Sequence, residues 1–280
     1  MASDFELERS PEARALAEEG LLRLLAALGN QDVHLVVLGG LVPEVLTRGL
    51  DVPGHLGTTD VDIHISFHTD SAQDLGALEN ALERAAFEPD PKIDGWRWRT
   101  QVSGVRIAME FLCDRDDAPA NTTVSLPGCR VLTAANLRGT GFVGRDWAAE
   151  ELTATLDGQP IRVKARFAGL EGYLMAKAYA VRYRSAEKDY YDFVYVLLFN
   201  QAGGASEVGA MLRDGKFADD LRSSQSVFRE IAARFANATA YGPSSYATQA
   251  LRVNPEEDIS RLRQDAARAV IDFIGTIGIL

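Results

Sequence analysis

Residues 60–67 alternate strictly between polar and apolar side chains, and this stretch constrains the fold more than any other part of the sequence. One side of the stretch is apolar: Val61, Ile63, Ile65 and Phe67. The other side is polar: Asp60, Asp62, His64 and Ser66. A period of two residues is that of a β-strand with one buried face. The chain is therefore expected to build a sheet that presents Asp60 and Asp62 on the face opposite its apolar core.

Two further apolar runs predict strands that accompany this one. Residues 34–38 form a short apolar run that ends at Gly39-Gly40, as a buried strand followed by a turn would. Residues 105–112 again alternate, and Glu110 lies on the less apolar of their two faces. The sheet is therefore expected to carry a third carboxylate on a second strand.

Helices are predicted before and between these strands. Ser10 and Pro11 suit the N-cap and the first position of a helix that continues to residue 28. The same kind of pattern predicts three shorter elements: a helix from Pro43 through Leu46, a helix over residues 71–86 and a hairpin over residues 96–104.

The pattern becomes helical throughout the second half of the chain. Four helices are expected there: residues 168–184, 188–200, 224–236 and 254–276, the last with Asn254 as N-cap and Pro255 at the first position. The predicted fold class is α+β, with a small mixed sheet and flanking helices in residues 1–160 and a helical half in residues 161–280.

The composition is that of a globular protein with an acidic surface. A formal net charge of −11 argues against wholesale, non-specific binding of nucleic acid but leaves room for a local basic groove. Two cysteines, Cys113 and Cys129, make neither a disulfide framework nor a CxxC metal pair. The N-terminus lacks the apolar core of a signal peptide, and no apolar stretch is long enough to cross a bilayer. A soluble, cytoplasmic protein is expected.

The two aspartates on the predicted strand have the spacing of a metal site. Residues i and i+2 of a strand point to the same side, with Cα atoms roughly 6–7 Å apart. Both carboxylates could then ligate Mg²⁺, which prefers a few carboxylates together with phosphate oxygens and water. Glu110 could supply a third carboxylate, either as a metal ligand or as the acceptor of a hydroxyl proton. The alternative is that Asp60 and Asp62 are only the solvated face of an edge strand.

The pair Gly39-Gly40 favours the chemistry of phosphates. A strand-to-helix turn without side chains lets a triphosphate approach backbone N–H groups, and the helix N-terminus adds a favourable dipole. Glycines at the end of one strand and two aspartates on the next form a more specific combination than either motif alone.

These residues resemble the signature of a known superfamily. Leu38-Gly39-Gly40, followed by Gly57-Thr58-Thr59-Asp60-Val61-Asp62-Ile63, is similar to the motif of the polymerase-beta-like nucleotidyltransferases. Within that superfamily the chain looks most like the AbiEii/MenT-type toxin nucleotidyltransferases, whose helical second half carries a Lys and then a Lys/Arg-Asp-x-x-Asp motif. Lys177 matches the first, and Lys188, Asp189 and Asp192 match the second. The resemblance covers residues 33–200.

The resemblance implies Mg²⁺-dependent transfer of a nucleotide from an NTP, ATP included, to an acceptor hydroxyl, with release of pyrophosphate. The implied catalytic residues are Asp60, Asp62, Glu110 and Lys177, the first three as metal ligands. The implied nucleotide-binding residues are Gly39, Gly40, Thr58, Thr59, Lys177, Asp189 and Asp192. Family members often carry Arg where this chain has Leu56, and Arg48 could make that contact instead. The NTP would lie in a cleft between the two halves.

Lys177 is unusual on physical grounds as well. It follows Leu170 by seven residues and Leu174 by three, so it belongs to the apolar stripe of its helix. An ammonium in that position must either extend to water or meet a phosphate or a carboxylate. Asp189 and Asp192 share a helix face and could position Lys177 or contact a substrate, or else complement the helix dipole.

The acceptor is the least constrained part of the prediction. The resemblance implies a tRNA 3′ end, a role as a toxin and a cognate antitoxin protein as partner. Seven cations form a local basic island that could line a groove for RNA: Arg162, Lys164, Arg166, Lys177, Arg182, Arg184 and Lys188. Two alternatives remain: a transferase for a small molecule of aminoglycoside type or a protein hydroxyl, and a protein without activity that only binds a nucleotide or a partner.

Overall fold

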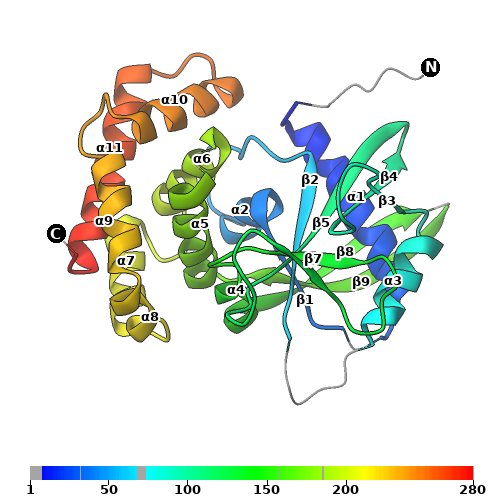
Figure 1. Ribbon diagram of the computed structural model, residues 1–280. Coiled ribbons are helices and arrows are strands. Elements are labelled where there is room, and N and C mark those ends of the chain that lie inside the picture. The colour runs from blue at the N-terminus through cyan, green and yellow to red at the C-terminus, as the bar shows by residue number, and fades with distance from the viewer. Residues whose placement is uncertain (1–7, 32, 68–73, 157, 185, 280) are drawn as a thin grey trace. The chain divides into compact units, whose positions relative to one another are not determined.

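The computed structural model describes residues 8–31, 33–67, 74–156, 158–184 and 186–279. The chain divides into two compact units (Figure 1). The sheet unit comprises Met1–Val42 and Gly57–Ala168, and the helical unit comprises Pro43–Leu56 and Gly169–Leu280. The predicted boundary at residue 160 differs from this division because the strand Gln159–Ala168 pairs along its whole length with the strand before it.

The sheet is mixed, as predicted, but it is larger than expected. Its described strands are β1 (Leu35–Leu38), β2 (Asp60–Ile65), β3 (Glu88–Pro89), β4 (Arg97–Val102), β5 (Val105–Cys113), β6 (Thr123–Ser125), β7 (Thr133–Asn136), β8 (Trp147–Leu156) and β9 (Gln159–Ala168). They run in the order β3-β4-β5-β2-β1-β9-β8, with β7 beside β5 and β6 beside β7. β2 is antiparallel to β1 and parallel to β5, so the aspartate strand lies in the interior of the sheet and is no edge strand.

One face of the sheet packs on two helices, α1 (Pro11–Leu28) and α3 (Leu75–Arg84), which also contact each other (Figure 1). Val61, Ile63 and Ile65 are completely buried on this face, as the alternation predicts. The predicted start of α1 is confirmed, because the Ser10 hydroxyl accepts a hydrogen bond from the amide of Ala13. Residues 71–73 of the helix predicted over residues 71–86 lie outside the described part of the chain.

The helical unit is built around α6. Its helices are α5 (Leu170–Arg184), α6 (Glu187–Leu198), α7 (Ala205–Asp214), α8 (Ala218–Ser223), α9 (Gln225–Arg234), α10 (Tyr241–Val253) and α11 (Ile259–Thr276), and most of α2 (Val42–Leu46) also belongs to it. Every residue from Asp189 to Leu197 is buried, and α6 contacts α5, α7, α10 and α11. A helix buried on all sides is the centre of a helical core. None of the helices in the described residues is long and apolar enough to cross a membrane.

Several elements differ from those predicted. Strands β6 to β9 and helices α4 (Phe142–Arg145), α7, α8 and α10 were not predicted. The last helix begins at Ile259 rather than at Pro255, so the predicted start is wrong. Asp258 is its N-cap, and the side chain accepts from the amides of Ser260 at 2.7 Å and Arg261 at 3.3 Å.

Glu79 connects α3 to the chain that follows β6. Its buried carboxylate accepts hydrogen bonds from the amides of Arg130 at 2.6 Å and Val131 at 2.8 Å. We expect Glu79→Ala to lower the free energy of unfolding by about 2–3 kcal/mol, because it leaves these amides without their acceptor.

Urea unfolding followed by tryptophan emission measures this effect, because all three tryptophans of the chain lie in the sheet unit. Glu83→Ala, on the same helix, is the control: its ion pair with Arg130 is exposed and should contribute at most about 1 kcal/mol. Equal losses in the two variants would contradict the role given to Glu79.

Candidate functional site

The carboxylates of the sheet unit lie together on one face of two neighbouring strands. Asp62 on β2 is in register with Glu110 on β5 and with Leu38 on β1. Asp60 lies two residues earlier on β2, beside Ala108. All of these side chains project from the face opposite α1 and α3, so this part of the chain brings Asp60, Asp62 and Glu110 together.

This polar face is open at one end only. Asp60 is half-buried and Asp62 is 9% exposed, whereas His64 and Ser66, further along, are more deeply buried. The helix α4 (Phe142–Arg145) covers that deeper end, since a Cβ atom on Gly144 would lie 2.6 Å from the Ser66 hydroxyl and 3.3 Å from His64 Nε2. Any ligand of the face must therefore approach at Asp60 and Asp62.

The glycine pair forms the turn that borders this open end. β1 ends at Leu38, and a single 3₁₀ turn (Gly39–Leu41) follows. Gly39 has a φ of +73°, and a Cβ atom there would collide with the Asp62 carboxylate. A Cβ atom on Gly40 would lie 2.6 Å from the Cβ of Thr58. Only glycine lets the backbone pass so close to both side chains.

Thr58 orients the first aspartate. Its buried hydroxyl donates a hydrogen bond of 2.6 Å to Asp60 Oδ1. Thr59, the other threonine of the predicted nucleotide-binding set, lies between Thr58 and Asp60 in the sequence and is half-buried. The motif Thr58-Thr59-Asp60 thus fixes a carboxylate at the open end of the face.

Glu110 is engaged differently from the aspartates. Its carboxylate forms an ion pair with Arg97, the residue opposite it on β4. Asp90 is buried close by and pairs with Arg99 at 2.5 Å, with Arg97 4.0 Å away. The side chain predicted as the third metal ligand is therefore held by a guanidinium.

Among the described residues, no group of three or more His, Cys, Asp or Glu side chains is arranged to hold a metal ion. Asp60 and Asp62 alone still fit Mg²⁺, which commonly takes one or two protein carboxylates and completes its shell with water and phosphate oxygens. Glu110 does not fit that role while it is paired with Arg97.

The other predicted residues come together in the helical unit. Lys177 of α5 is 6% exposed, and its ammonium contacts Asp192 Oδ2 at 2.8 Å and Asp189 Oδ1 at 3.0 Å. Arg184 also donates to Asp189 Oδ1, at 3.0 Å. Asp189 Oδ2 is buried and accepts no hydrogen bond from the residues described. Lys177 therefore meets carboxylates instead of extending to water, and the two cations balance the two acids.

His55 completes this network and was not predicted. Its ring is completely buried, and Nε2 lies 3.0 Å from Asp192 Oδ1. The rings of Tyr191 and Tyr195 flank it, with centroids 5.1 Å and 4.9 Å away. No local pattern could reveal the contact, because 137 positions separate His55 from Asp192.

Two more hydrogen bonds fix the segment that carries His55. The amide of Leu56 donates to the Tyr191 hydroxyl at 3.0 Å, and the Tyr195 hydroxyl donates to the Pro53 carbonyl at 2.7 Å. Burial raises the pKa of Tyr191 above its usual range, so its hydroxyl stays protonated. Leu56, at the position where the resembling family often has Arg, is buried, whereas Arg48 is exposed.

The predicted site residues thus form two groups. Gly39, Gly40, Thr58, Asp60, Asp62 and Glu110 surround the open end of the sheet's polar face, and Lys177, Asp189 and Asp192 form the buried network of the helical unit. No family model, curated protein or solved structure matches the chain. The interpretation of both groups therefore depends on their chemistry.

We expect Gly39→Ala to destabilise the sheet unit more than an alanine at another glycine of positive φ. Gly104 has a φ of +79° and no neighbour within 4 Å of an added Cβ, so Gly104→Ala should cost about 1–2 kcal/mol, for the backbone alone. Gly39→Ala should cost about 1–3 kcal/mol more, because the Asp62 side chain must move. Urea unfolding monitored by tryptophan emission compares the two variants, and equal costs would show that Asp62 does not constrain the turn.

We expect Lys177→Met to destabilise the helical unit by about 3–5 kcal/mol, because it leaves two buried carboxylates without their shared cation. All eight tyrosines belong to this unit, so tyrosine near-UV circular dichroism during urea unfolding reports on it. Lys188→Met, at a half-buried position of α6, is the control and should cost far less. A loss no greater than that of the control would contradict the network.

Proposed function

We propose that the protein is a Mg²⁺-dependent nucleotidyltransferase of the polymerase-beta-like type, which moves a nucleotide from an NTP to an acceptor hydroxyl and releases pyrophosphate. One observation carries the proposal: the backbone of the Gly39-Gly40 turn lies against Asp62 and against Thr58, which in turn bonds Asp60. A turn free of side chains next to two carboxylates, at the open end of a sheet face, suits a triphosphate that shares a metal ion with the protein.

Each group has a distinct part in the proposed reaction. Asp60 and Asp62 would hold Mg²⁺, which supplies charge neutralisation at the phosphates when bound. Thr58 fixes the orientation of Asp60. Glu110, held by Arg97, is better suited to position that arginine and the strand than to accept a proton directly.

The sequence resemblance assigns to Lys177 a contact with the departing pyrophosphate. An ammonium has three N–H donors, and two of those of Lys177 are directed to Asp189 and Asp192. These carboxylates, with His55 behind Asp192, keep the side chain in one orientation. The resemblance would direct the third donor to a phosphate oxygen, where developing negative charge would strengthen the contact.

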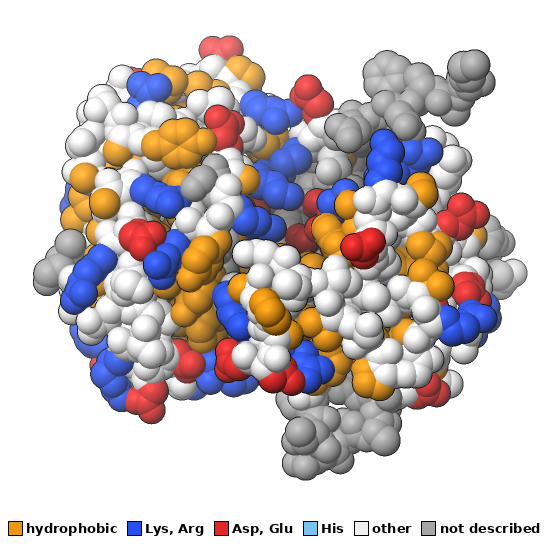
Figure 2. All heavy atoms as spheres, in the orientation of Figure 1, with side chains coloured by type: hydrophobic (Ala, Val, Ile, Leu, Met, Phe, Trp, Pro, Cys, Tyr) orange, Lys and Arg blue, Asp and Glu red, His pale blue; other side chains and the backbone are white. Residues whose placement is uncertain are grey.

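The proposed acceptor, a tRNA 3′ end modified by a toxin, follows from the sequence resemblance. The cations of the predicted basic island have different surroundings: Lys177 and Arg184 bind Asp189, and Arg182 pairs with Glu230 at 2.9 Å. On the face shown in Figure 2, basic and acidic side chains are interspersed. Recognition of a tRNA would then depend on a few local contacts more than on a broad basic surface.

The test is incubation of the protein with Mg²⁺, total tRNA and each α-labelled NTP in turn. We expect label in tRNA with the wild type and a loss of at least about 10³-fold in Asp60→Asn and Asp62→Asn, because each removes a metal ligand. Asp94→Asn, at an exposed position of the sheet unit, is the matched control and should keep full activity.

Other outcomes separate the competing functions. Label in an aminoglycoside or in protein, but not in tRNA, would keep the transferase and replace the acceptor. Binding of NTP without transfer to any of these acceptors would overturn the proposal and indicate a protein that only binds nucleotides.

A further inference from the structure

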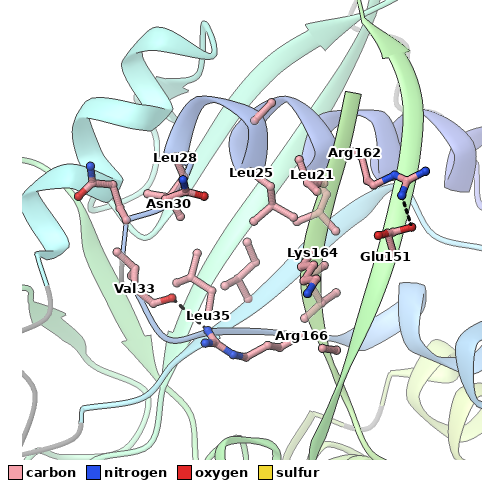
Figure 3. Close-up of a pocket in the computed structure, with 18 of the residues that line it drawn as sticks. Leu21, Leu25, Leu28, Asn30, Val33, Leu35, Glu151, Arg162, Lys164 and Arg166 are labelled. Carbon is pink, nitrogen blue, oxygen red and sulfur yellow. Dashed lines mark hydrogen bonds and ion pairs between the residues drawn. The ribbon is translucent and has the colours of Figure 1, made fainter. Parts of the chain in front are cut away.

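The sheet unit contains a cavity of about 830 Å³ that the proposed reaction does not use (Figure 3). It lies between α1 and the hairpin of β8 and β9. The hairpin joins the rest of the sheet at a single pair, Val37 with Phe167, whereas β8 and β9 pair with each other over ten residues. Most residues of β9 form no strand pair with β1, so a space remains between these two strands and next to α1.

The cavity is separate from the predicted carboxylates, because Asp60, Asp62 and Glu110 are not among the residues that line it. Its walls include Leu35, Val37 and Ile63, which belong to the apolar face of β1 and β2. Asp60 and Asp62 project from the other face. Arg162, Lys164 and Arg166 alternate with Phe167, which pairs with Val37, so these cations also project from that other face and the cavity extends through the gap between β1 and β9.

The cavity has an apolar wall on the helix side. Leu21 and Leu25 extend from α1 into the space, and Leu28 continues this wall at the end of the helix (Figure 3). Leu25 is half-buried, so part of this wall is accessible. A wall of this kind favours the apolar part of a ligand, and the volume is in the range of small-molecule sites, roughly 300–1,000 Å³.

The hairpin side of the cavity is basic. Arg162, Lys164 and Arg166 of β9 line it, together with one described acid, Glu151, which lies 3.5 Å from Arg162. Two net positive charges therefore remain in a chain whose net charge is −11. Lys164 is exposed at the cavity, and Arg166 is held in place by a 3.3 Å hydrogen bond to the Val33 carbonyl.

Trp147 of β8 also lines the cavity. It is 40% exposed, with the Arg166 guanidinium 5.1 Å above its ring and His34 edge-on at 5.5 Å. A large exposed ring beside the Arg166 guanidinium adds a surface that is both apolar and attractive to anions.

We propose that this cavity binds a small amphiphilic anion, with its apolar body against the leucines of α1 and its single carboxylate, sulfonate or phosphate group at Lys164 and Arg166. The cations disfavour a cationic ligand. A nucleic-acid strand would satisfy the cations but would leave the leucine wall without a partner. The proposal is independent of nucleotidyl transfer, since its test needs no catalytic activity.

The first test compares two probes of opposite charge, one with a twelve-carbon acyl chain (dodecanoate) and one with a twelve-carbon alkyl chain (dodecyltrimethylammonium), both below micelle formation. We expect saturable calorimetric binding of dodecanoate, a change in tryptophan emission that Trp147→Phe removes, and affinity at least tenfold higher than for the cation. Equal affinity for both probes, or no binding of either, would overturn the proposal.

Two pairs of variants locate the site. Lys164→Glu should weaken dodecanoate binding at least fivefold, whereas Lys92→Glu, an equal charge change at an exposed turn, should not. Ala149→Phe should narrow the cavity and weaken dodecanoate binding at least fivefold, whereas Ala148→Phe, at an exposed neighbouring position outside the cavity lining, should not. Circular dichroism verifies that each variant is folded.

A third arm tests a macromolecular occupant. A short single-stranded RNA is added in place of dodecanoate, with the same Lys164→Glu and Lys92→Glu pair. Binding of the RNA that depends on Lys164, without any binding of dodecanoate, would assign the cavity to nucleic acid and overturn the proposal. Equal weakening of dodecanoate binding by Lys164→Glu and by Lys92→Glu would also overturn the proposal.

Discussion

The close approach of the Gly39-Gly40 backbone to Asp62 and Thr58 is the constraint on which the sheet unit depends. It requires the register in which Leu38 opposes Asp62. A slip of one residue would turn Asp60 and Asp62 into the core and bring Val61 to the polar face. The completely buried Val61, Ile63 and Ile65 prevent that slip, so the apolar core on one side of β2 determines where the acids lie on the other.

The buried charges of the helical unit are harder to explain by stability. Lys177, Asp189 and Asp192 are almost inaccessible, and apolar side chains of similar size would often stabilise a core at least as well. Asp189 Oδ2 adds a cost, since a buried acceptor without a donor loses about 1–3 kcal/mol. In the proposed reaction, this cost would be offset by the fixed orientation that the two carboxylates give to the Lys177 ammonium.

Strong periodicity and capping predicted much of the architecture. The alternation from Asp60 predicted the orientation of β2, and Ser10-Pro11 predicted the start of α1. The hairpin of β8 and β9 was not predicted, although the alternation from Ile161 to Phe167 is that of a strand, and the cavity beside it was missed with it. The ion pair of Glu110 with Arg97 and the contact of His55 with Asp192 depend on tertiary packing, which local sequence does not specify.

The placement of Pro43–Leu56 in the helical unit has a consequence for synthesis on the ribosome. The partners of His55, Leu56 and Pro53 follow them by 137, 135 and 142 positions. At roughly 5–20 residues per second, this segment waits on the order of ten seconds for α6 to be made. The nascent chain can pair β1 with β2 before that time, but the segment between these strands gains its native contacts only when α6 has emerged.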